Sequence, residues 1–240
     1  MNSLSTRNAS QSPIFAYTAA FVVFMILLAL VPMVEKILPA TGNPWFAKGA
    51  FLVYPLQTIL CGALLLYVRR RVEFRGIAYL SVTFALGFFV FAMWTSPQFF
   101  HWAPPRTDGF NPDVFAPGST SYWVTVVLRF LRLVVVVPFL EEIFWRGFLM
   151  RYLISESFEK VPFGKYDVRA FWITVIAFGL AHYGNHALPG QDFYAALLTG
   201  VIYNAVACLT KSLGTCVFVH AVTNLFLGLY IMFTKQWGFW

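Results

Sequence analysis

Long apolar stretches separated by short polar segments run from residue 14 to residue 233 of the chain. A membrane-spanning helix needs about 20 predominantly apolar residues. By this criterion the sequence predicts seven spans, at Ile14–Met33, about Gly49–Val68, about Gly76–Trp94, Phe130–Met150, about Phe171–Leu188, Phe193–Leu209 and Leu213–Phe233. We therefore predict an all-α, polytopic membrane helix bundle of seven to eight transmembrane helices. Residues 121–128 add the eighth helix if they insert instead of lying at the interface.

The pattern divides the chain into four parts. Residues 1–13 form a polar N-terminal tail, and residues 14–120 hold the first spans and a polar, proline-rich loop at Thr95–Ser119. Residues 121–233 form the core that carries the candidate chemistry, and residues 234–240 form a short C-terminal tail. The first apolar run is too long for the hydrophobic region of a signal peptide, so we expect an uncleaved first span.

Basic residues indicate how the spans are oriented. The densest cluster, Arg69–Arg71 with Arg75, lies between the second and third spans, and cytoplasmic loops are enriched in Lys and Arg. Counting from that loop places the N-terminus and the connection Ser155–Arg169 in the cytoplasm. The Thr95–Ser119 loop and the C-terminus then face outward.

The composition supports a lipid environment. The chain is 59% hydrophobic and 11% charged, whereas soluble domains average roughly 25% charged residues. Its net charge of +7 comes from Lys and Arg at the ends of apolar segments, and no alternation of aromatic and basic residues indicates nucleic-acid binding. We expect the lipid bilayer, and no nucleic acid, as a partner. Cys61, Cys208 and Cys216 lack a disulfide or metal spacing, so we expect buried free thiols.

The fourth span contains adjacent carboxylates, Glu141 and Glu142, followed by Arg146. Ionisable side chains in hydrocarbon are costly, and an intramembrane cluster of them is by default a functional hypothesis. Glu142 and Arg146 are one helical turn apart, so their pairing neutralises one carboxylate. Pro138 is expected to kink the helix just before the glutamates and to free backbone groups there.

Three arginines lie in or beside the same span, away from the two glutamates. Arg129 and Arg151 lie near its two ends, where both can snorkel to the membrane surface, and Arg132 lies just inside.

Two further polar pairs occur at helical i, i+4 spacing, Phe178 with His182 and His220 with Asn224. With the spans given above, Glu141 and both histidines lie within roughly 5 Å of the membrane midplane at 1.5 Å rise per residue. The sequence therefore predicts one site assembled between three helices. His186 is interpreted as interfacial, and His101 and Asp192 as loop residues.

The residue types suit hydrolysis of a peptide bond. A carboxylate in a low-dielectric site is a stronger base than in water, so Glu141 can take a proton from an attacking water. His182 can hold that water or protonate the leaving amine. His220 and Asn224 share a helix face and can donate hydrogen bonds to a developing oxyanion.

Four other interpretations stay open. The polar residues can be purely structural, holding helices together in a scaffold or immunity protein, and His220 with Asn224 can simply bridge two helices. One Glu and two His can supply zinc ligands, although the HExxH motif is absent. Buried charges are also typical of transporters, although no internal repeat is evident.

The three motifs together resemble those of a known family. Glu-Glu-x-x-x-Arg at 141–146, Phe-x-x-x-His at 178–182 and His-x-x-x-Asn at 220–224 are similar, in order and interval, to the motifs of the glutamic intramembrane endopeptidases. This family contains the CAAX prenyl proteases and related bacterial bacteriocin-processing or immunity (CPBP-type) proteins. Overall size and the loop Trp102…Gly109–Pro112 also resemble a bacterial exosortase-associated subgroup.

The resemblance implies a role for each residue. Glu141 is the water-activating base and His182 assists it, His220 and Asn224 form the oxyanion hole, and Glu142 with Arg146 supports the site. It implies a conical cavity, catalysis without a metal or other cofactor, and a membrane-embedded or lipid-anchored protein or peptide as substrate. The expected location is the bacterial inner membrane.

Overall fold

The computed structural model describes residues 12–38, 42–183 and 191–240, and within these ranges it consists of helices and connecting loops without a β-strand. Six helices are long and apolar enough to cross a membrane, and α7 is a shorter apolar helix. The helices are α1 Pro13–Ile37, α2 Ala50–Val68, α3 Leu80–Phe99, the central helix Thr120–Tyr152, α7 Val168–Ala181, α8 Gln191–Thr210 and α9 Leu213–Thr234. The predicted all-α polytopic membrane bundle is confirmed.

The predicted spans agree with these helices, with differences at their ends. Residues 121–128 are not a separate element, because α4 (Thr120–Leu131) begins there and continues into the central helix. α3 extends five residues beyond the predicted Trp94, so part of the expected loop is helical. Residues 1–11 of the expected tail 1–13, the end of the predicted fifth span and His186 lie outside the described residues.

Local sequence explains where three of the helices begin. The side chains of Ser119, Asp167 and Ser212 accept hydrogen bonds from backbone N–H groups in the first turns of the central helix, α7 and α9. Such N-caps satisfy donors that have no partner within the helix.

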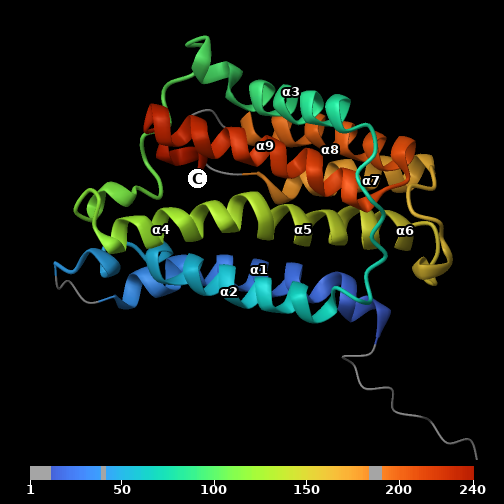
Figure 1. Cartoon of the computed structure of the whole chain (residues 1–240), viewed down its shortest axis with the longest axis horizontal. Helices are drawn as coiled ribbons and strands as arrows, with labels where there is room; N and C mark the ends of the chain where they lie inside the picture. Colours follow the sequence, from blue (N-terminus) through green and yellow to red (C-terminus); the bar gives the residue numbers. More distant parts are fainter. Residues whose placement is uncertain (1–11, 39–41, 184–190) are drawn as a thin grey trace, which may run out of the picture.

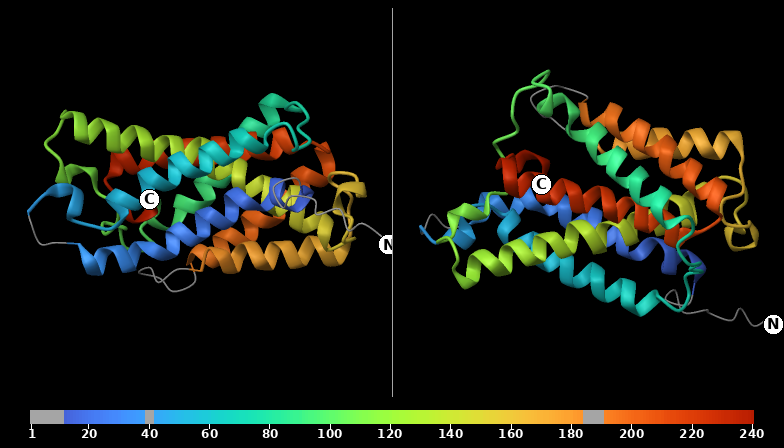
Figure 2. Two further views of the ribbon diagram at one scale, coloured as in Figure 1. Left: turned by 90° about the horizontal axis from the view of Figure 1, so that it is seen from below. Right: turned by 45° about the horizontal axis from the view of Figure 1, so that its top comes forward.

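The helices form layers around the central helix (Figures 1 and 2). α1 and α2 pack together on one side of it, whereas α3, α7, α8 and α9 lie on the other. α3 packs closely on α9 at Gly87, where a Cβ atom would lie 2.8 Å from the carbonyl oxygen of Val219. The central helix therefore contacts both layers, and half of the residues in an apolar 18-residue stretch of it are buried.

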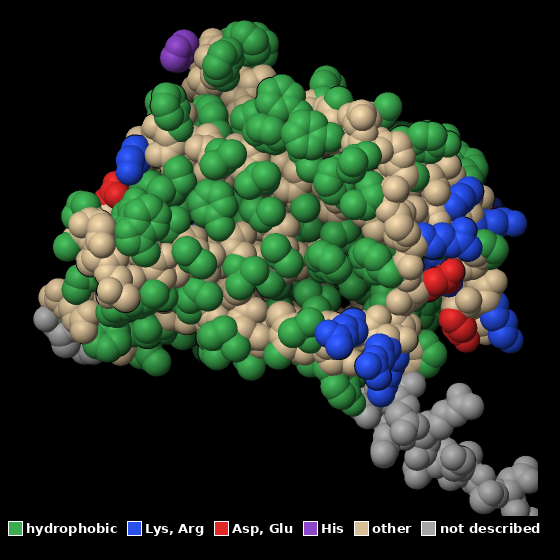
Figure 3. Space-filling model, viewed as in Figure 1, with side chains coloured by type: hydrophobic (Ala, Val, Ile, Leu, Met, Phe, Trp, Pro, Cys, Tyr) green, Lys and Arg blue, Asp and Glu red, His purple; other side chains and the backbone are tan. Residues whose placement is uncertain are grey.

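Large apolar side chains cover the outside of the molecule, as expected in lipid (Figure 3). Lys and Arg side chains gather at one end of the view in Figure 3. α2 ends at that side, in the sequence Arg69–Arg71, and the central helix ends there too. This separation of apolar flanks and basic end is the arrangement of a membrane protein.

The arginines of the central helix are not placed as the sequence suggested. Arg129, Arg132 and Arg151 are all buried in the protein, so the expectation that Arg129 and Arg151 snorkel to the surface is wrong. Arg129 lies over the rings of Tyr54 and Phe110, and the Arg151 guanidinium donates to three backbone carbonyl oxygens. Aromatic faces and carbonyl groups thus stabilise these cations in place of water.

Two smaller expectations also need correction. Asp192 belongs to the first turn of α8, not to a loop, and its carboxylate accepts a hydrogen bond from buried Arg106 at 2.6 Å. All three cysteines are free, as predicted, but Cys208 is only partly buried.

Candidate active site

The central helix changes register on both sides of the two glutamates. A π-helical segment, Arg132–Val136, precedes the α-helical turns Val137–Glu142, and a second one, Ile143–Leu149, follows them. In the first, the N–H of Val137 bonds to the carbonyl oxygen of Arg132, five residues back. π-Helical turns inside α-helices occur frequently at functional sites.

Pro138 explains how the first π-helical segment joins the site. In that register the next N–H along the chain would bond to the carbonyl of Leu133, but residue 138 is a proline and has no N–H. The side-chain amide of Asn224 fills the gap, because its Nδ2 donates to the Leu133 oxygen at 2.8 Å. The predicted release of a backbone group by Pro138 is therefore observed, and α9 is fixed to the central helix at that position.

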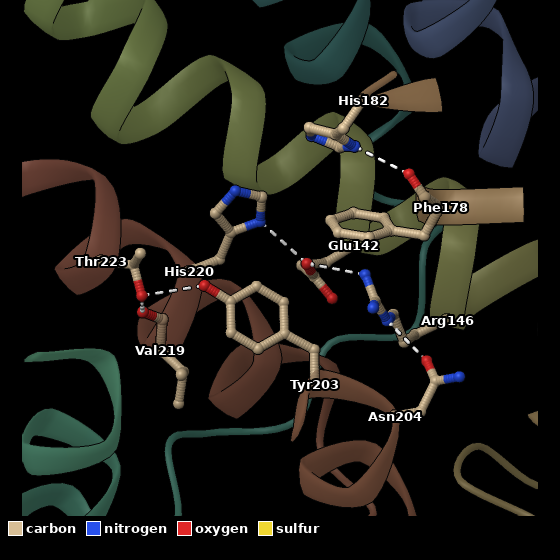
Figure 4. Close-up of polar contacts among 9 residues, drawn as sticks. All are labelled: Glu142, Arg146, Phe178, His182, Tyr203, Asn204, Val219, His220 and Thr223. Carbon is tan, nitrogen blue, oxygen red and sulfur yellow. Dashed lines mark hydrogen bonds and ion pairs between the residues drawn. The ribbon is translucent and has the colours of Figure 1, made fainter. Parts of the chain in front are cut away.

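Glu142 is the centre of a buried polar network (Figure 4). Its Oε1 accepts a hydrogen bond from Nη1 of Arg146 at 3.1 Å, and both side chains have no exposed surface. Arg146 Nε donates to Oδ1 of Asn204 at 2.9 Å, and Asn204 Nδ2 donates to the backbone oxygen of Phe171 at 3.0 Å. The predicted local pair is present, and it also links the central helix to α8 and α7.

His220 contacts the second glutamate. Its Nδ1 lies 2.8 Å from Oε1 of Glu142, on the opposite side from Arg146 (Figure 4). A carboxylate only accepts, so Nδ1 carries the proton of this bond and Nε2 is left for another partner. The sequence had indicated Arg146 as the partner of Glu142, but gave no sign that His220 would share the same oxygen.

His182 ends α7 and is held by its own helix. Its Nδ1 lies 2.8 Å from the backbone oxygen of Phe178, and the two rings are 4.4 Å apart. Because a carbonyl oxygen accepts only, Nδ1 bears a hydrogen here, and Nε2 of the neutral ring is a free acceptor. The Phe-x-x-x-His spacing thus places His182 one turn after Phe178, whose backbone carbonyl orients the imidazole ring.

Glu141 differs from its neighbour because its carboxylate has no hydrogen-bond partner among the described residues, whereas Oε1 of Glu142 accepts two hydrogen bonds. The Oε2 atoms of both glutamates are buried and without a partner. It lines a cavity of about 170 Å³ together with His182, His220 and Asn224. The structure therefore brings the four side chains that the sequence predicted as catalytic to one cavity, from the central helix, the end of α7 and α9. Glu142 and Arg146 lie behind its wall.

Several other residues line the cavity, and sequence reasoning did not single them out. Tyr203 donates from its hydroxyl to Oγ1 of Thr223 at 2.9 Å, and Trp94 Nε1 donates to Oγ1 of Thr199 at 2.7 Å. The sequence could have pointed to these residues because each is a polar or amphipathic side chain inside an apolar span. The same is true of Asn204. Phe239, near the C-terminus, also reaches the cavity and has no such signal.

In the ranges covered by the structure, no three His, Cys, Asp or Glu side chains are grouped closely enough to hold a metal ion.

Two comparisons with known proteins bear on this geometry. Residues 123–226, which include all three motifs, match the family described as type II CAAX prenyl endopeptidase Rce1-like. The chain is also 23% identical over 198 residues to the uncharacterized protein YyaK of Bacillus subtilis (strain 168), a match that covers 80% of this chain. The matched region covers 58% of the length of that relative. No solved structure matches the chain significantly, and neither match concerns the exosortase-associated subgroup.

Proposed function

Because residues 123–226 match the Rce1-like sequences, the chain belongs to the CAAX prenyl protease family, and we propose that it is an intramembrane endopeptidase. The observation that carries this proposal is the cavity shared by Glu141, His182, His220 and Asn224. Glu141, whose carboxylate has no hydrogen-bond partner among the described residues, shares this cavity with two histidines and an amide, a combination suited to activating water beside a carbonyl group.

In the proposed reaction, Glu141 takes a proton from a water molecule whose oxygen attacks the carbonyl carbon of the peptide bond. Nε2 of neutral His182 is a free acceptor and holds the second hydrogen of this water. The new C–O bond leaves a negative charge on the former carbonyl oxygen. The C–N bond then breaks, and the proton held by Glu141 passes to the leaving amine.

Two groups of α9 stabilise the oxyanion in this scheme. Asn224 uses one amide hydrogen for the Leu133 carbonyl and retains the other for the substrate. Nδ1 of His220 is held by Glu142, so Nε2 is the ring nitrogen left for the oxyanion, and it can donate when both ring nitrogens carry a hydrogen.

The substrate class proposed is a membrane-embedded or lipid-anchored protein or peptide, since the cavity is formed within membrane-spanning helices. The proposed location is the bacterial inner membrane with a cytoplasmic N-terminus, because Lys and Arg concentrate at one end of the molecule. The alternative is a non-catalytic scaffold or immunity protein that uses the same polar network to hold its helices.

The test compares membrane and secreted peptides from cells that express the wild type, Glu141→Gln or Glu35→Gln. Glu35 is an exposed carboxylate at the end of α1, so its variant is the matched control. We expect cleavage products to disappear in Glu141→Gln alone. With purified protein and a substrate found in this way, Asn224→Ala should lower the rate about 10²–10³-fold, as single-donor deletions do elsewhere.

Two results would contradict the proposed glutamate mechanism. Unchanged peptide products in Glu141→Gln cells would support the scaffold. Loss of cleavage on adding a strong chelator, restored by zinc, would replace the glutamate mechanism with a metal site.

A further inference from the structure

A second, larger cavity lies on the other side of the central helix from the candidate active site. This α2 groove has a volume of about 570 Å³ and lies between α2 and the central helix. The helix contributes Leu131, Val135, Val136, Phe139 and Ile143 to the groove, and Leu133, Val137 and Glu141 to the candidate active site. The two cavities have no lining residue in common, so they are separate.

The α2 groove is apolar except at one end. Thr58 contributes a hydroxyl group to the lining, but this group already donates a hydrogen bond to the backbone oxygen of Tyr54 at 2.8 Å. Its charged group is the exposed side chain of Arg69, at the C-terminal end of α2. Among the described residues no carboxylate lies within ion-pair distance of Arg69. An apolar groove with an unpaired cation at one end suits an amphipathic ligand, whose apolar part lies in the groove and whose negatively charged head meets the cation.

The surroundings of the groove give its orientation. Leu66 and Leu131, at its rim, are 64% and 44% exposed, so the groove opens on the apolar surface of the spans. Arg69 belongs to the basic cluster at the end of α2, where Glu73 is a nearby acidic residue and its carboxylate lies 3.7 Å from Arg75. Figure 3 shows this change from apolar flank to basic end. The groove thus runs from the lipid region toward the headgroup region.

We propose that the α2 groove binds an anionic glycerophospholipid, with one acyl chain against Gly62 and Phe139 and the phosphate at Arg69. Basic clusters at the ends of membrane helices bind anionic headgroups, with roughly 1 kcal/mol per Lys or Arg. The acyl chain would cover the central helix from the end of its first π-helical segment, at Val136, to the start of the second, at Ile143. Bound lipid should therefore also raise the thermal stability of the protein.

Gly62 offers a way to fill the groove without disturbing the fold. A Cβ atom at this position would meet one atom within 4 Å, Cγ2 of Val136 at 3.9 Å, which is an ordinary contact. Gly62→Leu should therefore place its side chain in the space of the acyl chain, and replacing a helical glycine also favours the helix.

The experiment titrates the purified, delipidated chain in detergent with phosphatidylglycerol or with phosphatidylcholine of the same acyl chains, and counts bound lipids by native mass spectrometry. Arg69→Gln removes the proposed headgroup contact. Arg70→Gln, its neighbour outside the groove lining, is the matched control with the same change of charge. Thermal unfolding of each variant without lipid shows that the fold is retained.

We expect one phosphatidylglycerol to bind more tightly than phosphatidylcholine. Arg69→Gln should weaken it about five-fold, the equivalent of roughly 1 kcal/mol, and Arg70→Gln less than two-fold. Gly62→Leu should remove the tight site and the lipid-induced rise in Tm.

Any of four results would overturn the proposal. Equal losses in the two arginine variants would indicate diffuse surface attraction, and equal binding of both lipids would indicate ordinary lipid packing. Unchanged phosphatidylglycerol binding by Gly62→Leu would place the acyl chain elsewhere. A dimer that Gly62→Leu dissociates would mean that a second copy of the chain occupies the groove.

Discussion

Glu141 and Glu142 are adjacent in the sequence but lie in different surroundings. Neighbouring residues of a helix point about 100° apart, so one side chain faces the cavity while the other faces the packed interior. Oε1 of Glu142 accepts from both Arg146 and His220, whereas the carboxylate of Glu141 has no hydrogen-bond partner among the described residues. The division of labour proposed for them, one base and one structural carboxylate, follows from this rotation.

Arg146 is the residue whose loss should affect stability most directly. Arg146→Ala leaves the carboxylate of Glu142 buried without its cation, which should cost roughly 3–5 kcal/mol. Asn204→Ala removes a neutral hydrogen-bonding partner of the same guanidinium and should cost less, about 1–3 kcal/mol. The measurement is thermal unfolding of the two purified variants. A fully stable but inactive Arg146→Ala would instead assign Arg146 to substrate binding.

Among the helices, the central one is irregular on both sides of the two glutamates, with π-helical segments at Arg132–Val136 and Ile143–Leu149. Pro138 removes the backbone donor for Leu133, and Asn224 of α9 replaces it. The irregular helix and the neighbouring helix therefore depend on each other. The same interaction places Asn224 at the wall of the cavity.

This dependence predicts a coupling between Pro138 and Asn224. In the wild-type background, Asn224→Ala leaves the Leu133 carbonyl without a donor, which should cost about 1–3 kcal/mol. In a Pro138→Ala background the restored N–H can bond to that carbonyl, so the same substitution should cost less. The free energies of unfolding of the two single variants and the double variant measure the difference. Equal costs in both backgrounds would show that Pro138 does not create the vacancy that Asn224 fills.

At the scale of the whole molecule, the basic end predicts the orientation in the membrane. We expect a single cysteine at Glu156, in the loop after the central helix, to be protected from a membrane-impermeant maleimide applied outside intact cells. A cysteine at Ala116, in the long loop before that helix, should react. Both positions are exposed in the structure, and the native cysteines are replaced by alanine for this measurement. The reverse pattern would invert the topology.

The helical membrane architecture could be predicted from the sequence because it depends on local properties. Span lengths follow from the thickness of the bilayer, and a backbone in lipid must satisfy its own hydrogen bonds. The pair of Glu142 and Arg146 was equally predictable, because residues four apart always meet on a helix. The positions of His182, His220 and Asn224 within their spans indicated one shared site, because the position of a residue along a span sets its depth in the membrane.

The tertiary structure alone decided which polar groups meet across helices. His220 bonds to Glu142, 78 residues away, Asn224 bonds to a backbone carbonyl, and Arg106 reaches Asp192. Such contacts depend on how each helix is rotated about its axis. Helices that are apolar on all sides carry little pattern to set that rotation, because lipid and protein interior are similarly apolar. The sequence by itself therefore determined the helices and the depth of their polar residues, and packing between helices determined the partners.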